Sequence, residues 1–211
     1  MKHYLFDFDG TLVDSMPTFA SVMLRILDEN GISYGDDIIR IITPLGYGNT
    51  AKYFVTLGVP RSEEELVETM NTYAAYEYAH NVEAKAHVID TLRALKARGD
   101  DLSILTASPH LMLDPCLKRL GIYDLFTNVW SCNDFATSKS DPAIYRMAAE
   151  RMGVSVGEVI FLDDNLGADT TAKNAGTQVI GVYDESSRED EAAIRAVADG
   201  YIRDFSELLA L

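Results

Sequence analysis

The sequence predicts an α/β fold: a doubly wound parallel sheet that carries a small inserted helical domain. Three observations support this prediction. Short apolar runs alternate with amphipathic helical stretches along most of the 211 residues, which is typical of βαβ units. The alternation stops between Leu12 and about Glu83, where only helical patterns occur. Polar residues follow the apolar runs, at the positions where open α/β sheets bind ligands.

Five apolar runs are expected to be strands. The first, Tyr4 to Phe8, is rich in aromatic residues and leads into Asp-Gly-Thr, which favours a tight turn at the end of a buried strand. The other runs are residues 102–105, 128–131, 159–162 and 179–182. Because helical stretches separate most of these runs, the strands are expected to be parallel.

Caps and spacing predict the helices of the sheet domain. The strongest helix follows Asp141, a suitable N-cap, has Pro142 at its first position and stops at Gly153. Its apolar residues recur at helical spacing at Ile144, Met147, Ala148 and Met152. A second helix is expected over residues 88–95, and Asp114-Pro115 is expected to start a short third one.

The inserted block is expected to be entirely helical. Its first helix has one apolar face and stops at Gly31. The apolar positions are Phe19, Val22, Met23, Ile26 and Leu27. Further helical patterns cover residues 36–42, 49–57 and 62–78. We therefore expect residues 1–14 and 84–211 to form the α/β core domain and residues 15–83 to form a helical cap domain.

The charge of the chain limits its partners. A formal net charge of -15 repels phosphate backbones and anionic lipids, so nucleic acid and membrane surfaces are not expected to bind. The sequence has no apolar stretch typical of a signal peptide or a membrane helix, so a cytoplasmic location is expected. Cys116 and Cys132 lie among apolar neighbours without metal-ligand spacing and are expected to be reduced core thiols.

The most informative motif follows the first strand. Asp7 and Asp9 are two residues apart, so the strand period directs both carboxylates to one side. Gly10 and Thr11 allow a sharp turn whose backbone N–H groups can bind an anion. Two other interpretations are an ordinary Asx turn and a calcium loop, and the second fails because the Gly and Glu of an EF-hand are absent at their required positions.

Two carboxylates beside an anion site require a cation to offset their repulsion. Asp163 and Asp164, at the end of another predicted strand, supply further oxygen ligands suited to Mg²⁺. Thr106 ends a third strand, and Lys139 follows a fourth by several residues. The carboxyl ends of parallel strands meet at one edge of a sheet, so these side chains are expected to lie together.

These motifs resemble those of the haloacid dehalogenase superfamily of phosphatases and phosphomutases over nearly the whole chain. The first motif resembles residues 7–12, Asp-Phe-Asp-Gly-Thr-Leu, and is highly specific. The second resembles residues 104–106, the third Lys139 with residues 141–145, and the fourth residues 159–164 followed by Ala175-Gly176. The resemblance implies a Rossmann-like core with a helical cap, as in the phosphoglycolate phosphatase and β-phosphoglucomutase subfamily.

The resemblance also implies a role for each motif. Asp7 would attack phosphorus to form an aspartyl-phosphate, and Asp9 would be the general acid and base. Mg²⁺ would bind a carboxylate oxygen of Asp7, the backbone carbonyl of Asp9 and a carboxylate oxygen of Asp164, with Asp163 as fourth ligand or water-holder. The phosphate-binding residues would be Gly10, Thr11, Thr106, Ala107 and Lys139.

Some of these assignments depend on the others. A Thr that ends a strand is more often a β-former, and a lone Lys is usually solvated. The functional roles of Thr106 and Lys139 are therefore assigned only because the first and fourth motifs are present. The chain departs from the family in the fourth motif, where Ala168 stands at the spacing of a later acid and Asp169 follows it. Asp169 is therefore expected to be a helix N-cap rather than a ligand.

Substrate choice is expected to depend on the cap, because a cap closes over the site and excludes bulk water. The candidates are Tyr47, Gly48, Asn49, Thr50 and Lys52, beside two glycines that let the backbone approach a ligand. The alternative is an ordinary helix start with Asn49 as N-cap. Both interpretations are open at this stage.

The resemblance implies a Mg²⁺-dependent hydrolase of a small phosphorylated metabolite such as phosphoglycolate or a sugar phosphate, as a monomer or weak dimer. The main alternative is a phosphomutase of the β-phosphoglucomutase type, which uses the same residues. Carbon–halogen and phosphonate cleavage are disfavoured because such relatives generally lack an acid at the position of Asp9. Motif order argues against a receiver-like binding module, and the presence of every catalytic residue type argues against an idle relative.

Overall fold

The computed structural model describes residues 1–211 apart from the side chain of Pro44. Across the described residues, six strands form one parallel sheet in the order β3-β2-β1-β4-β5-β6. The strands are β1 (His3–Phe6), β2 (Asp101–Thr106), β3 (Asn128–Ser131), β4 (Val159–Asp163), β5 (Gln178–Val182) and β6 (Gly200–Ile202). The predicted fold class, a doubly wound Rossmann-like sheet with a helical insertion, is confirmed.

The centre of the sheet is the point where the strand order reverses. From β1 the chain forms β2 and β3 on one side and then β4, β5 and β6 on the other. Open α/β sheets bind ligands at such a switch point, beyond the carboxyl ends of the strands. The register pairs Phe6 with Leu162. Asp7, which follows β1, and Asp163, the last residue of β4, are therefore neighbours at the carboxyl edge of the sheet.

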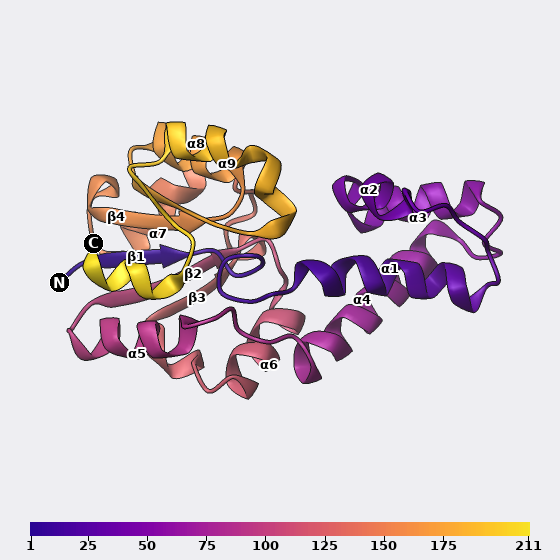
Figure 1. Cartoon of the computed structure of the whole chain (residues 1–211). Coiled ribbons are helices and arrows are strands. Elements are labelled where there is room, and N and C mark those ends of the chain that lie inside the picture. The colour runs from indigo at the N-terminus through magenta and orange to yellow at the C-terminus, as the bar shows by residue number, and fades with distance from the viewer. The chain divides into compact units, whose positions relative to one another are not determined.

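Helices cover both faces of this sheet (Figure 1). They are α5 (Val88–Ala97), α6 (His110–Arg119), α7 (Ala143–Met152), α8 (Leu166–Ala175) and α9 (Glu191–Val197). The side chains of β1 alternate between the two faces, as a strand period of two requires. Leu5 joins the buried cluster that includes Tyr145 of α7, whereas Phe6 stacks on Tyr4 and packs against Phe205 on the other face.

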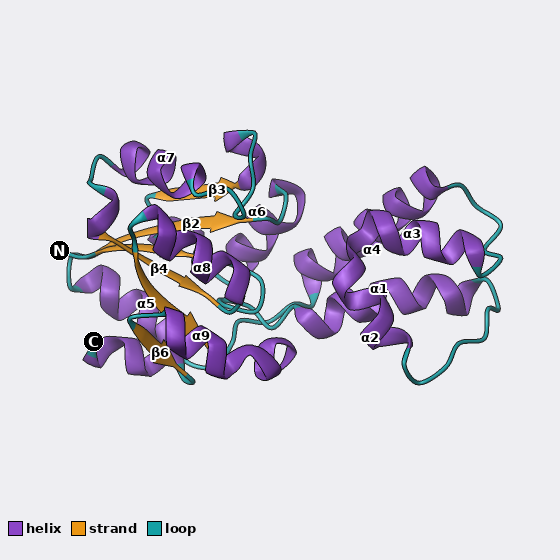
Figure 2. Cartoon of the chain, turned by 90° about the horizontal axis from the view of Figure 1, so that it is seen from above, coloured by secondary structure: helices purple, strands orange, loops and turns teal.

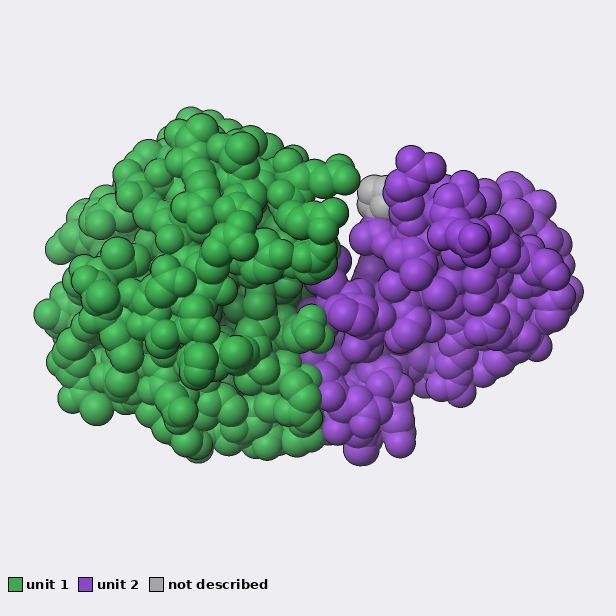
Figure 3. All heavy atoms as spheres, viewed as in Figure 1, with its two compact units in different colours: residues 1–14, 83–211 green, residues 15–82 purple. Residues whose placement is uncertain are grey.

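The chain divides into two compact units (Figure 3). Unit 1 comprises residues 1–14 and 83–211, and unit 2 comprises residues 15–82. Unit 2 is helical, with α1 (Met16–Glu29), α2 (Ile38–Ile42), α3 (Gly46–Thr56) and α4 (Glu63–His80) (Figure 2). The helices α1, α3 and α4 contact one another, and each buries apolar side chains, among them Met23, Phe54 and Met70. A capping box at Ser62 and Glu65 starts α4.

Several predicted boundaries are wrong. Helix α6 begins at His110 rather than at Asp114, with Pro115 inside it, and α7 begins one residue after Pro142. Asp141 still contributes to the start of α7, because its carboxylate accepts the N–H of Ala143 at 2.9 Å. Strand β6 and helix α9 were not predicted, since their apolar runs are too short to show a period.

Candidate active site

The loop after β1 brings the first motif to the carboxyl edge of the sheet. The N–H of Asp7 donates to the Leu162 carbonyl at 2.8 Å, which extends the β1–β4 pairing by one residue. The Asp7 side chain is buried, and the chain then turns sharply at Gly10, whose φ is 73°. A Cβ at Gly10 would lie 2.7 Å from Oδ2 of Asp164, so only glycine allows this approach.

Lys139 links the first and fourth motifs. Its Nζ lies 2.6 Å from Oδ1 of Asp7 and 2.7 Å from Oδ2 of Asp163. Its backbone is fixed by Tyr145 of α7, whose hydroxyl donates to the Lys139 carbonyl at 3.1 Å. The structure thus places this residue, which follows β3 only after the turn Cys132–Phe135, between the two central acidic strand ends.

Asp164 faces the turn of the first motif. The Thr11 hydroxyl donates to Oδ1 of Asp164 at 3.1 Å, and both side chains are buried. The neighbouring carboxylate of Asp163 accepts the N–H of Asn165 at 2.8 Å, in addition to its contact with Lys139. The predicted first and fourth motifs therefore form one cluster.

Burial determines how these groups titrate. Burial raises the pKa of Asp7 to about 7, against the opposing charge of Lys139. Burial and the neighbouring Asp163 raise the pKa of Asp164 well above its usual range. Burial alone would lower the pKa of Lys139, but Asp163 and Asp7 outweigh it and hold this pKa well above its usual range. The metal-free fold thus resists ionisation of Asp7 and Asp164, and a cation bound among the carboxyl groups would favour their ionised forms.

The cluster fits a divalent cation. Asp7, Asp163 and Asp164 each offer a carboxylate oxygen, and these oxygens lie within 4.8 Å of one another. Carboxylate oxygens are the ligands that Mg²⁺ prefers. With all three carboxyl groups ionised, the cluster and Lys139 would carry two net negative charges, which a divalent ion would neutralise. The donor set and its charge thus agree with the predicted Mg²⁺.

Asp9 is turned toward the end of β2. Its Oδ2 accepts the Ser108 hydroxyl at 2.5 Å, across 99 residues of sequence. Thr106 is buried at the end of β2, and its Oγ1 accepts the N–H of Ser108 at 3.0 Å, which leaves the hydroxyl hydrogen available for another acceptor. Ala107, between them, is exposed. The sequence analysis gave Ser108 no role.

Asp169 is not the helix N-cap that the sequence analysis expected. Asn165 caps α8, because its Oδ1 accepts the N–H groups of Gly167 and Ala168 at 2.9 and 3.1 Å. Asp169 lies one turn into the helix, fully buried, and neither carboxylate oxygen has a hydrogen-bond partner among the described residues. Burial, followed by the charge of Asp163, raises its pKa to about 9.

A second lysine beside the site was missed by the sequence analysis. Lys85 donates to the carbonyls of Gly10 at 2.6 Å and Tyr183 at 2.5 Å, and to the buried carboxylate of Asp184 at 3.1 Å. It thereby ties the first motif to the end of β5. Lys85 lies in a stretch without any motif, so only the fold could reveal the contact.

The candidate cap residues lie around the first two turns of α3 in unit 2. Tyr47 stacks on Phe19 of α1 with ring centroids 4.8 Å apart, while Gly48, Asn49 and Lys52 are exposed. Asn49 is not an N-cap: α3 already begins at Gly46, and the Asn49 amide donates to the Leu45 carbonyl at 3.2 Å.

Thr50 differs from the other candidate cap residues. Its side chain is fully buried, and its hydroxyl donates to the Ile42 carbonyl at 3.4 Å. This contact connects α3 to the end of α2 and occupies the hydroxyl donor. The exposed polar candidates are therefore Asn49 and Lys52.

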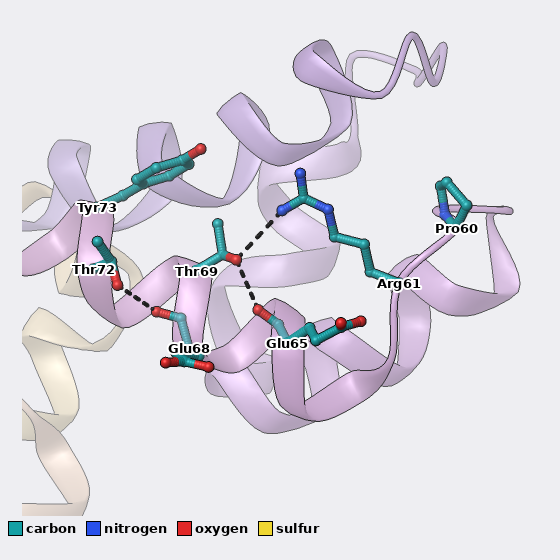
Figure 4. A pocket seen from close by; sticks show the side chains of 7 residues that line it. All are labelled: Pro60, Arg61, Glu65, Glu68, Thr69, Thr72 and Tyr73. Carbon is teal, nitrogen blue, oxygen red and sulfur yellow. Dashed lines mark hydrogen bonds between the residues drawn. The ribbon is translucent and has the colours of Figure 1, made fainter.

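Unit 2 also carries an open hollow of about 510 Å³ along α4 (Figure 4). Its lining residues are Pro60, Arg61, Glu65, Glu68, Thr69, Thr72 and Tyr73. None of them is a predicted site residue. Arg61 donates to the Thr69 hydroxyl at 3.4 Å, so its guanidinium group lies against the surface of α4.

Comparison with known proteins identifies the family. The sequence pattern of the haloacid dehalogenase-like hydrolases matches residues 4–182, which include β1 apart from His3, strands β2 to β5 and all of unit 2. The chain belongs to this family. The predicted family and the predicted enzyme class, a hydrolase of the haloacid dehalogenase superfamily, are therefore confirmed.

Individual relatives agree with this membership. The chain is 31% identical over 183 residues to pyrophosphatase PpaX of Bacillus velezensis, covering 84% of this chain and 81% of that protein. It is 30% identical over 206 residues to a phosphoglycolate phosphatase of Rhodospirillum rubrum, covering 93% of this chain and 86% of that protein. A putative β-phosphoglucomutase of Thermotoga maritima has the same fold, with a TM-score of 0.85 at 23% identity over 100% of this chain and 97% of that one.

Among the helices of the described residues, none is both long and apolar enough to cross a membrane.

Proposed function

We propose that this chain is a Mg²⁺-dependent phosphatase that hydrolyses a small phosphomonoester through an aspartyl-phosphate on Asp7. The observation that carries the proposal is the cluster at the switch point of the sheet. Carboxylate oxygens of Asp7, Asp163 and Asp164 lie within 4.8 Å of one another there, and Lys139 contacts two of these residues. Phosphoglycolate is the first candidate substrate, because a relative of 30% identity is a phosphatase of that compound. A sugar phosphate is the second.

The first half-reaction would transfer the phosphoryl group to Asp7. A carboxylate oxygen of Asp7 attacks phosphorus, and the bond between phosphorus and the substrate oxygen breaks. The carboxyl group of Asp9 gives its proton to that leaving oxygen, so that a neutral alcohol departs. Lys139 would offset the negative charge on the phosphoryl oxygens, and the hydroxyl of Thr106 would donate a hydrogen bond to them.

The second half-reaction would restore the enzyme. The Asp9 carboxylate takes a proton from a water molecule, whose oxygen attacks phosphorus, and the bond from phosphorus to Asp7 breaks to release inorganic phosphate. Mg²⁺, held by Asp7, the Asp9 carbonyl, Asp163 and Asp164, would supply charge neutralisation for the phosphoryl oxygens. Unit 2 would be the cap that excludes bulk water, with Asn49 and Lys52 toward the non-reacting end of the substrate.

The proposal is tested by phosphate release from a panel of phosphorylated metabolites, with Mg²⁺ and with a chelator. Asp7→Asn should abolish release and leave the metal-free unfolding temperature nearly unchanged, whereas Asp36→Asn, an exposed acid of unit 2, should retain full activity. Wild-type turnover in Asp7→Asn would overturn the nucleophile assignment. Isomerisation of a sugar phosphate with little phosphate released would replace the phosphatase by a phosphomutase.

The cytoplasmic location, the lack of nucleic-acid and membrane partners and the monomeric or weakly dimeric state stay predictions from charge and sequence. Size-exclusion chromatography with light scattering measures the last of them directly.

A further inference from the structure

Ser108 makes a contact that the reaction scheme above does not use. Its hydroxyl donates to Oδ2 of Asp9 at 2.5 Å, the length of a strong, charge-assisted hydrogen bond. Ser108 lies in the loop between β2 and α6, and it is only half-buried. The contact joins two segments that come from different strand ends of the same sheet.

The loop around Ser108 is itself held in place. The backbone N–H of Ser108 donates to Oγ1 of Thr106 at 3.0 Å, and Thr106 is buried at the end of β2. The position of the Ser108 hydroxyl is therefore set by the rigid strand rather than by a free loop. By contrast, Asp9 directly precedes the turn at residues 10–12, pairs with Val13 in an isolated bridge and is half-buried.

We infer that Ser108 is a positioning residue that holds the Asp9 carboxyl group for proton transfer, an inference that rests on the proposed acid and base role of Asp9. A carboxyl group has two oxygens, and proton transfer to a leaving oxygen uses one of them. The Ser108 hydroxyl engages Oδ2 and so fixes the rotation of the carboxyl plane.

A small error in the position of a general acid is costly. Proton transfer by a placed side chain contributes on the order of 10²- to 10⁴-fold to rate, and misplacement of about 1 Å can cost roughly 100-fold. Ser108→Ala is therefore expected to lower kcat by about 10- to 100-fold, with a smaller effect on KM. Ser108→Thr keeps the hydroxyl and should restore most of this loss.

The leaving group distinguishes a positioning role from a purely structural one. Phenyl phosphate has a basic leaving oxygen that needs a proton, whereas p-nitrophenyl phosphate leaves as a weakly basic anion that needs little help. Single-turnover formation of the intermediate should therefore slow much more with phenyl phosphate than with p-nitrophenyl phosphate in Ser108→Ala. An equal loss with both esters would overturn the inference.

Two further variants complete the test. Ser155 also donates its hydroxyl to a carboxylate at 2.5 Å, that of Glu158, but on the exposed surface outside the site, so Ser155→Ala should have wild-type kinetics. In an Asp9→Asn background, Ser108→Ala should cause little further loss, because its partner's function is already gone. A full additional loss there would mean that Ser108 acts on the substrate instead. Normal turnover in Asp9→Asn alone would refute the proposed acid and base, a result separate from either outcome for Ser108.

Discussion

Magnesium should stabilise the fold as well as support the reaction. The perturbation is the addition of Mg²⁺ to chelator-treated protein. Burial raises the pKa values of Asp7 and Asp164, which means that the folded state resists ionising these carboxyl groups. A divalent ion between them would favour the ionised carboxylates, and it binds only where the fold brings the three carboxylates within 4.8 Å of one another.

The size of the effect follows from binding linkage. A ligand at about 100 times its Kd stabilises the folded state by about 2.7 kcal/mol. For a chain of this length, each kcal/mol raises Tm by about 2–4 °C. The expected rise in Tm is therefore about 5–11 °C at saturating Mg²⁺.

Differential scanning calorimetry with Mg²⁺ and with a chelator measures this rise. Asp164→Asn should lose it, and without metal this variant should melt no lower than the wild type, because it removes a carboxyl group that is costly to bury. Asp36→Asn should keep the full rise, since it lies on the exposed surface of unit 2. An unchanged Tm in the wild type on saturation with Mg²⁺, or the same rise in Asp164→Asn, would refute the metal-site reasoning.

Three further predictions test single contacts. Lys139→Met leaves two buried carboxylates without their cation and should lower the metal-free unfolding free energy by about 3–5 kcal/mol in urea titrations. Gly10→Ala places a Cβ against Asp164 and should abolish the Mg²⁺-dependent rise in Tm, whereas Gly31→Ala, at a φ of 65° with open space around it, should lose only about 1–2 kcal/mol of stability. Hydrogen bonds to Asp114 and Asp134 raise the pKa of His110. The protonated imidazole should therefore contribute its full stabilisation below the unfolded pKa of about 6.5, and this contribution should disappear as the pH rises through the folded pKa. His110→Gln should flatten the pH dependence of Tm over that range, and an unaltered profile would contradict the assigned charge.

The pattern of apolar runs and caps was sufficient for most of the fold. The five predicted strands lie where the period and the flanking turns indicated, because buried parallel strands are continuous apolar runs. The start of α6 was predicted wrongly because Pro115 favours a helix start locally, and packing of the buried Met112 and Leu113 extends the helix before it. Strand β6 has only three residues and depends on pairing with β5.

The sequence by itself determined which residue types could react. Asp7-Phe8-Asp9-Gly10-Thr11 combines two acids at a strand end with a turn, and that local chemistry is complete within five residues. The acidic pair at Asp163 and Asp164 is equally local. Both motifs could therefore be found without knowing where the chain goes next.

Only the tertiary structure decided which polar and charged side chains lie in contact and which are buried. The contact of Ser108 with Asp9 spans 99 residues and that of Lys85 with Gly10 spans 75, and neither residue belongs to a motif. Asp169 was expected to be a helix N-cap, but the packing of α8 on the sheet buries it, and its carboxylate has no hydrogen-bond partner among the described residues. The electrostatic energy of a charged group depends on how deeply its side chain is buried and on its distance from other charged groups. For residues remote in sequence, both quantities are defined only by the folded structure.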